Sequence, residues 1–240
     1  MLANDVVIKI AAKLQTSEQN IRREYFQHLF LSRFYEWPDA GKVYFKGGTA
    51  LHLIYNNPRF SEDLDFDTDL RSIPALENLV VGTLAAIEKE GAETQLHEAK
   101  ETSGGYLAIA DFTAQGYTTP IQLEISLRNG KKKEGTATTV SSDFFPAYNL
   151  VQLEREFLIG GKMRALLERH KPRDFYDFYF LLRAGMIQER KREVLERVLA
   201  LLSEKNFHFD DELKEFLPKN QWLIIRHFKQ TLEAEIARYL

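Results

Sequence analysis

The sequence contains no cysteine. This absence excludes disulfide bonds, thiolate zinc sites and cysteine nucleophiles. Histidine, the other common zinc ligand, is scattered along the chain without the spacing that a metal site requires. Because a chain without disulfides suits a reducing compartment, we expect a cytoplasmic protein.

Long hydrophobic runs are also missing. No apolar stretch reaches the roughly 20 residues that a membrane-spanning helix needs. The N-terminal residues carry an early acid, Asp5, and lack the basic start of a signal peptide, so we expect no membrane association. A basic excess is lacking too, since the net charge is −3 and the pI is about 6.1. This balance argues against a protein that coats nucleic acid, although an enzyme can carry a local basic channel.

The composition is that of a packed globular protein. Hydrophobic residues make up 44% of the 240 residues, and the 17 Phe and 10 Tyr favour a packed core over disorder. A chain of this length can bury its core in one large domain or two small ones. We see no internal repeat and no low-complexity tract.

The most informative stretch begins with a glycine turn. Val43–Phe45 is apolar and predicts a short buried strand, which Gly47 and Gly48 break. Thr49–Tyr55 then predicts one or two helical turns, which Pro58 ends. Glycines between a strand and a helix let backbone N–H groups approach an anion, and the helix N-terminus favours the negative charge.

Two aspartates follow this turn. Ser61–Phe66 is predicted as a second strand, so Asp63 and Asp65 project from one face. Neighbouring carboxylates resist ionising together unless a cation lies between them, and Mg²⁺ commonly takes one or two carboxylates plus substrate phosphates. A phosphate cradle followed by an acidic pair is the equipment for nucleotidyl transfer.

These residues also carry a resemblance. Residues 47–49 and 59–66, together with a second block of Lys-x-Arg-Ala-Leu at 162–166 and Arg-Asp-x-x-Asp at 173–177, resemble the AbiEii/AbiGii toxin family. That family belongs to the polymerase-β-like nucleotidyltransferase superfamily, whose pattern is a Gly-Gly or Gly-Ser turn, an Asp-x-Asp and a distant third carboxylate. The resemblance covers most of the chain. Gly160 and Gly161 depart from the helix formers expected before the lysine.

The third carboxylate is sought in three strand-like stretches, Thr94–Lys100, Tyr106–Thr113 and Ile121–Leu127. In the last of these the apolar side chains share one face, and Glu124 lies on the other. Glu124 is therefore the natural third metal ligand, and the resemblance implies an acid at this place. The competing interpretation is an exposed glutamate on a half-solvated sheet.

The resemblance implies a set of site residues. The predicted catalytic residues are Asp63, Asp65, Glu124, Ser61 and Lys162, with Asp63, Asp65 and Glu124 holding Mg²⁺, or Mn²⁺ in its place. The predicted nucleotide-binding residues are Lys46, Gly47, Gly48, Thr49, Arg59, Lys162, Asp174 and Asp177. Asp174 and Asp177 lie three apart on one side of a predicted helix. They either orient the nucleotide with Lys162 or form a structural ion network, with Asp174 as a helix cap.

The remaining segments predict scaffold. Asn4 is expected to cap a first helix, Thr16 with Gln19 to open a second one to about Tyr35, and Pro74 to stand near the start of a helix through about Glu90. Residues 129–142 have a loop composition, in which Lys131, Lys132 and Lys133 are candidates for RNA contact. Arg128 before them is a candidate for phosphate contact. From about Leu150 the pattern is helical, with one helix over Gln152–His170.

The fold class predicted is α+β, a polymerase-β-like nucleotidyltransferase core with a mixed sheet and flanking helices plus a helical C-terminal bundle. The expected parts are N-terminal helices at 1–40, the core at 41–142 and the helical domain at 143–240. The function implied is Mg²⁺-dependent transfer of a nucleoside monophosphate from a nucleoside triphosphate to an acceptor, such as the 3′ end of a tRNA. The resemblance also implies a toxin of a type IV-like, abortive-infection toxin–antitoxin system in phage defence, with a cognate antitoxin.

Two other functions compete with this prediction. One is a catalytically silent module of the same fold that binds a nucleotide or a partner. The other is a metal-dependent phosphohydrolase, which usually needs further ligands, often histidines, that are not found at the right spacing.

Overall fold

The computed structural model describes residues 1–127, 134–187, 192–204 and 207–240. The chain divides into two compact units. One unit, here the sheet unit, contains residues 1–56 and 60–155. The other, the helical unit, contains residues 57–59 and 156–240. The chain thus leaves the sheet unit at residue 57 and returns to it at residue 60.

The sheet unit carries a mixed sheet. Its helices are α1 (Asn4–Leu14), α2 (Glu18–Phe34), the 3-10 turn η1 (Pro38–Lys42), α3 (Gly47–Tyr55) and α4 (Ile73–Lys89). Its strands are β1 (Val43–Lys46), β2 (Leu64–Thr68), β3 (Glu93–Thr102), β4 (Gly105–Ala114), β5 (Tyr117–Ser126), β6 (Gly135–Ser142) and β7 (Phe145–Leu153). Across the described residues the strand order is β3-β4-β5-β2-β1-β7-β6. β2 runs parallel to β5 and β1 parallel to β7, while the other neighbours are antiparallel.

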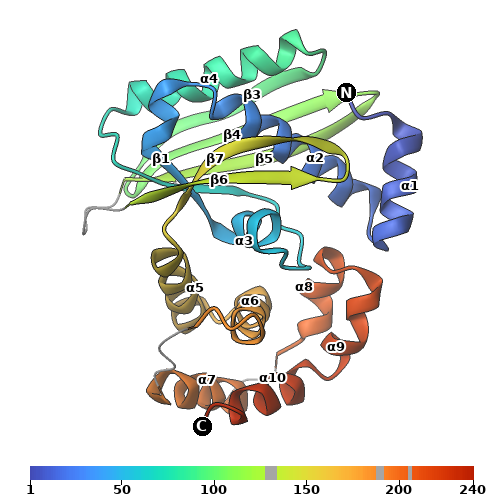
Figure 1. Ribbon diagram of the computed structural model, residues 1–240, viewed down its shortest axis with the longest axis vertical. Helices are drawn as coiled ribbons and strands as arrows, with labels where there is room; N and C mark the ends of the chain where they lie inside the picture. The colour runs from blue at the N-terminus through green and yellow to red at the C-terminus, as the bar shows by residue number, and fades with distance from the viewer. Residues whose placement is uncertain (128–133, 188–191, 205–206) are drawn as a thin grey trace. The chain divides into compact units, whose positions relative to one another are not determined.

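One face of the sheet forms the core with α2 and α4 (Figure 1). Phe34 of α2 packs against Phe66 of β2 with ring centroids 5.5 Å apart, and Phe30 packs edge-on against Phe112 of β4. All four rings are fully buried. Because side chains alternate along a strand, burial of Leu64 and Phe66 turns Asp65 to the opposite face.

The N-terminal helices begin differently from the prediction. Asn4 is the first helical residue of α1 rather than its cap, and its side chain accepts from Arg22 of α2. Ser17 caps α2, accepting from the backbone N–H of Asn20 at 3.2 Å. The Thr16 hydroxyl accepts from the Asn20 side chain instead, so the expected capping box at Thr16 is wrong by one residue.

The segment expected as a loop contains a strand. Residues 135–142 form β6, which pairs antiparallel with β7. The predicted helix over Gln152–His170 is wrong at its start, since Gln152 belongs to β7 and the helix begins at Arg155. Threonine and valine in 135–142 favour a strand, but the adjacent glycines and lysines dominated the composition. Arg128 and Lys131, Lys132 and Lys133 lie outside the described residues.

The described part of the helical unit contains no strand. Its elements are α5 (Arg155–Arg169, whose first residue lies in the sheet unit), α6 (Pro172–Arg183), α7 (Arg192–Glu204), α8 (Phe209–Phe216), η2 (Lys219–Gln221), α9 (Trp222–Arg226) and α10 (Phe228–Ala237). Aromatic rings fill its core, where Phe228 stacks on Tyr176 and meets Phe209 edge-on. Among the helices that the structure describes, none combines the length and apolarity required to cross a membrane.

Candidate active site on the open face of the sheet

A row of side chains crosses four adjacent strands on the face opposite α2 and α4. In the strand register, Lys46 of β1 lies opposite Asp65 of β2, and Asp65 lies opposite Glu124 of β5. Glu124 in turn lies opposite Leu107 of β4. Paired residues of adjacent strands present their side chains on the same face, with the strands about 4.8 Å apart. The expectation that Glu124 lies on the same side of the sheet as Asp65 is therefore confirmed.

The row lines a cavity of about 250 Å³. Besides Lys46, Asp65, Glu124 and Leu107, the lining includes Ser126 of β5, Thr102 at the end of β3, and Ser103 and Gly104 in the turn between β3 and β4. Asp65 is half-buried and Glu124 is exposed, so solvent and a ligand can reach both carboxylates. Glu124 also accepts a hydrogen bond from the Gln122 side chain at 2.7 Å.

The glycine turn forms one side of this site. α3 starts at Gly47, two residues earlier than predicted, directly after β1. Gly47 has φ of +86°, and a Cβ at this residue would lie 2.0 Å from Oδ2 of Asp65. Only glycine meets both conditions, because other residues rarely adopt this φ and their side chain would displace the carboxylate. The first turn of α3 contains no acid and has no side-chain cap, so its N-terminus presents a positive potential to the neighbouring Asp65 carboxylate and to an anion that approaches it.

A third aspartate on this face was missed by the sequence analysis. Asp67 of β2 is 5% exposed and accepts a hydrogen bond from the Lys46 amine at 2.6 Å. The alternation Asp63-x-Asp65-x-Asp67 was the signal that could have identified it. Since Lys46 is held by Asp67, the lysine balances a buried acid while Asp65 and Glu124 give the cavity its negative character.

Asp63 and Ser61 are placed differently from the prediction. β2 begins at Leu64, so both residues lie in the segment before the strand and the alternation argument does not apply to them. The Asp63 carbonyl accepts the Thr49 hydroxyl, and the Ser61 carbonyl accepts the Gln27 amide at 2.9 Å. Neither residue lines the cavity.

Two side chains of α2 that the sequence analysis did not assign to the site hold this segment in place. Gln27, 1% exposed, donates to the carbonyls of both Ser61 and Glu62, and Arg23 pairs with Glu62 at 3.1 Å. Polar residues on the buried side of an amphipathic helix were the available signal.

The donor set suits a hard cation in part. Within the residues that the structure describes, no group of three or more His, Asp or Glu side chains is arranged to hold a metal ion. Asp65 and Glu124 are nevertheless adjacent oxygen donors at a cavity, and Mg²⁺ commonly takes one or two carboxylates and completes its shell with phosphates and water. The pair therefore fits such an ion, while a metal role for Asp63 stays a prediction.

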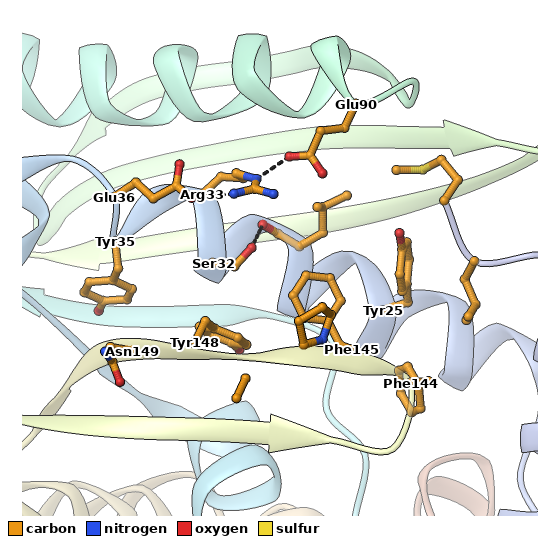
Figure 2. A pocket seen from close by; sticks show the side chains of 15 residues that line it. Tyr25, Ser32, Arg33, Tyr35, Glu36, Glu90, Phe144, Phe145, Tyr148 and Asn149 are labelled. Atoms are coloured by element: carbon orange, nitrogen blue, oxygen red, sulfur yellow. Dashed lines mark hydrogen bonds and ion pairs between the residues drawn. The ribbon is translucent and has the colours of Figure 1, made fainter.

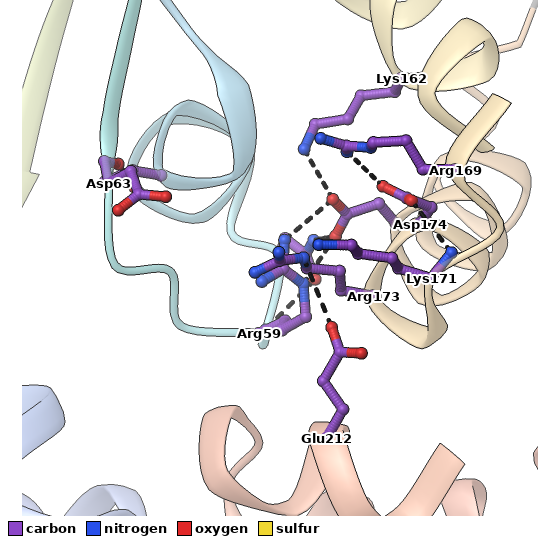
Figure 3. Close-up of polar contacts among 11 residues, drawn as sticks. Arg59, Asp63, Lys162, Arg169, Lys171, Arg173, Asp174 and Glu212 are labelled. Atoms are coloured by element: carbon purple, nitrogen blue, oxygen red, sulfur yellow. Dashed lines mark hydrogen bonds and ion pairs between the residues drawn. The ribbon is translucent and has the colours of Figure 1, made fainter. Parts of the chain in front are cut away.

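Three of the predicted residues, Arg59, Lys162 and Asp177, form a buried network in the helical unit (Figure 3). Arg59 donates to both carboxylate oxygens of Asp177 at 2.9 Å, and Lys162 and Asn57 add bonds of 2.7 and 3.0 Å. Asp177 is 1% exposed and Arg59 is 3% exposed. Burial alone would raise the pKa of Asp177, but Arg59 and Lys162 outweigh it and hold this pKa well below its usual range.

Asp174 caps helix α6. Its carboxylate accepts from the Lys171 backbone N–H at 3.2 Å and from Arg169 at 2.6 Å. Arg173 pairs with Glu212 of α8 at 3.4 Å. These contacts favour the structural alternative for Asp174 and Asp177, and nucleotide contacts by these two residues, Arg59 and Lys162 stay predictions.

A second cavity, of about 580 Å³, lies beside α2 and the start of β7 (Figure 2). Tyr25, Phe145 and Tyr148 give it aromatic walls, and Arg33 lies within it, paired with Glu36 and Glu90. No predicted site residue lines this cavity.

Comparisons with known proteins identify a family from the sequence and related folds among solved structures. The model of the family described as nucleotidyl transferase AbiEii toxin, type IV TA system, matches residues 29–236. Among solved structures, JHP933 from Helicobacter pylori has 21% identity and a TM-score of 0.64, with 92% of each chain covered. MenT4, a nucleotidyltransferase toxin from Mycobacterium tuberculosis, has 15% identity and a TM-score of 0.67, covering 99% of this chain and 90% of that one. No curated protein matches the chain. Since the family model spans most of the sequence, the chain belongs to the AbiEii family of nucleotidyltransferase toxins of type IV toxin–antitoxin systems.

Proposed function

We propose that the protein transfers a nucleoside monophosphate from a nucleoside triphosphate to an RNA acceptor, such as the 3′ end of a tRNA. The reaction takes place at the cavity on the sheet face opposite α2 and α4, and it requires Mg²⁺ or Mn²⁺. The observation that carries this proposal is the row of Lys46, Asp65 and Glu124 at one cavity beside the Gly47 corner. The reaction would take place in the cytoplasm and would arrest growth as part of phage defence. A cognate antitoxin would counter it.

The chemistry is a displacement at phosphorus. An acceptor hydroxyl oxygen forms a bond to the α-phosphorus, the bond from that phosphorus to the bridging oxygen of the β-phosphate breaks, and pyrophosphate leaves with the electron pair. The hydroxyl proton is released to water. A bound divalent cation would neutralise phosphate charge and lower the pKa of the hydroxyl. Residues Asp65 and Glu124 would hold that cation, and the backbone N–H groups at the start of α3 would orient the triphosphate.

The direct test incubates labelled nucleotides, Mg²⁺ and total RNA with the wild type, Asp65→Asn or Glu124→Gln. The rates at which the three proteins label RNA are then compared. We expect each variant to lose at least about 100-fold in transfer rate, because positioning and charge stabilisation supply most of the catalysis. Glu93→Gln is the matched control, since Glu93 is an exposed strand glutamate of the same sheet outside the cavity. Equal labelling by Asp65→Asn and the wild type would remove Asp65 from the chemistry.

Calorimetry separates transfer from binding alone. Nucleotide binding that depends on magnesium, without labelling of any RNA by the wild type, would support the silent binding module. Mass spectrometry of RNA from cells that express the protein would then identify the acceptor and the nucleotide added.

A further inference from the structure

The cavity has two chemically different ends, and the order of strands gives their positions. Lys46 and Gly47 lie at the β1 end, and Leu107 lies at the β4 end, with Asp65 and Glu124 between them. Thr102 at the end of β3 and the turn of Ser103 and Gly104 close the β4 end, because this turn joins β3 to β4 and lines the same cavity.

In phosphoryl transfer the attacking and leaving oxygens lie roughly in line, on opposite sides of the phosphorus. The proposed function puts the triphosphate at the Gly47 corner, so pyrophosphate leaves towards the β1 end. The attacking hydroxyl must then approach from the β4 end. Resting on that proposed function, we infer that the β4 end is the acceptor subsite and that it takes the terminal ribose and base of an RNA strand.

The side chains at the β4 end suit that ligand. Thr102 and Ser103 offer hydroxyls that can bond to a ribose, Ser126 of β5 adds another where it lies opposite Gly105 of β4, and Leu107 offers a half-buried apolar surface to a base. Lys100 is the next member of the row, since it pairs with Leu107 across β3 and β4. It is exposed and also contacts Glu98, which leaves its position suited to an RNA phosphate that approaches along this edge.

The turn is held rigidly enough to act as a rim. The Leu127 N–H donates to the Gly104 carbonyl at 2.8 Å. Gly105 has φ of +151°, and a Cβ there would lie 2.0 Å from the Ile125 carbonyl oxygen, so the backbones of β4 and β5 are in close contact at this point. A rim fixed in this way offers a preformed surface, which lowers the entropy lost when an acceptor binds.

The test compares how variants of the β4 end change the Michaelis constant for RNA and the Michaelis constant for the nucleotide. Ser103→Trp fills the rim at an exposed turn residue, so it is expected to fold, which thermal unfolding checks. With total tRNA as the acceptor probe, we expect its KM for RNA to rise at least about tenfold while its KM for the nucleotide stays within about twofold. Ser126→Ala removes one hydrogen-bonding hydroxyl and should raise the KM for RNA about threefold to tenfold. Lys100→Gln should also raise the KM for RNA, and Lys42→Gln is its control, because Lys42 is another exposed, ion-paired lysine of the sheet unit but lies outside the row.

Each other outcome is decisive. A rise in the nucleotide KM alone would place the donor base at the β4 end and overturn the inference, as would unchanged constants in both variants. Labelling of protein instead of RNA would overturn the acceptor class. Failure of the wild type to transfer any nucleotide would remove the proposed function itself, and this inference with it.

Discussion

Two clusters of acids and bases, one in each unit, differ in access rather than in composition. In the sheet unit Asp65 and Glu124 line a cavity beside Lys46, where solvent reaches them. In the helical unit Asp177 is 1% exposed and is bound by Arg59 through two hydrogen bonds. Both clusters combine acids with basic side chains, but Asp65 and Glu124 line a cavity, whereas Asp177 is enclosed by its hydrogen-bonding partners.

The comparison teaches how to separate chemistry from architecture. A buried charge is tolerated when partners satisfy it, and the loss of one partner then leaves the other uncompensated. An accessible carboxylate at a cavity adds little to stability, so its removal changes what the site binds. Substitutions in the two clusters should therefore separate stability from activity.

The largest expected effect on stability is that of Asp177→Asn. The amide carries no charge, so Arg59 and Lys162 lose the anion that compensates them, and we expect the helical unit to lose about 3–5 kcal/mol in free energy of unfolding. The sequence has two tryptophans, Trp37 in the sheet unit and Trp222 in the helical unit. In a Trp37→Phe background, urea titration followed by fluorescence reports the helical unit alone.

Two controls complete that experiment. Asp211→Asn changes an exposed aspartate of α8 in the same unit, and Asp65→Asn changes the accessible cluster and is measured in a Trp222→Phe background, where Trp37 reports the sheet unit. Both should change the free energy of unfolding by less than about 1 kcal/mol. If Asp177→Asn is as stable as the wild type but inactive, the structural interpretation of this network is wrong and the nucleotide-binding one is right.

A buried acid inside the sheet unit tests whether burial, rather than the unit, decides the outcome. Glu24 of α2 is 8% exposed and contacts His28 at 3.6 Å and His52 of α3 at 3.1 Å. Burial would raise its pKa, but the nearby His28 and His52 side chains outweigh burial and lower the pKa to about 2 from its ordinary 4.5. A pKa depressed in the folded state stabilises the fold above the unfolded value, and this stabilisation is lost as the pH falls from about 4.5 to about 2.

Glu24→Gln should therefore destabilise the protein by about 3 kcal/mol above pH ~5, with the difference from the wild type vanishing as the pH approaches ~2. The measurement is the free energy of unfolding as a function of pH, using Trp37 fluorescence in a Trp222→Phe background. Glu18→Gln, a half-exposed glutamate on the same helix, should differ from the wild type by less than about 1 kcal/mol throughout. A constant difference between Glu24→Gln and wild type down to pH 2 would contradict the charge-based explanation.

Local signals in the sequence were sufficient for much of the scaffold and for the positions of Glu124 and the glycine corner. Alternation in Ile121–Leu127 correctly placed Glu124 on the face of Asp65, because strand periodicity and the parallel pairing of β2 with β5 agree. The glycine pair correctly marked the corner between β1 and α3. These features depend on neighbours in the chain, which the sequence displays directly.

The features that the sequence did not reveal are those that distant contacts decide. The partner of Arg59 is Asp177, 118 residues away in the chain and in the helical unit, and the predicted phosphate contact of Arg59 stays a prediction. β6 was hidden because its pairing with β7 supplies the stabilisation that a Gly- and Thr-rich segment lacks by itself. The start of β2 at Leu64 separates Asp63 from the strand, although alternation alone treats the two aspartates as equivalent.

The smallest expected effect on stability, and the sharpest on geometry, is that of Gly47→Ala. Gly47 and Gly116 both have positive φ, +86° and +81°, but a Cβ at Gly47 would lie 2.0 Å from Oδ2 of Asp65, whereas a Cβ at Gly116 meets nothing within 4 Å. Alanine at Gly116 should therefore cost about 1–2 kcal/mol in free energy of unfolding from backbone strain, and alanine at Gly47 at least as much, because Asp65 must also move. Only Gly47→Ala should also reduce transfer activity, by at least about tenfold, because the Asp65 carboxylate must move from its place beside the turn. Equal activity in the two variants would mean that the close approach of Gly47 to Asp65 is a packing feature, and the accessible cluster would then resemble the buried one more than its cavity suggests.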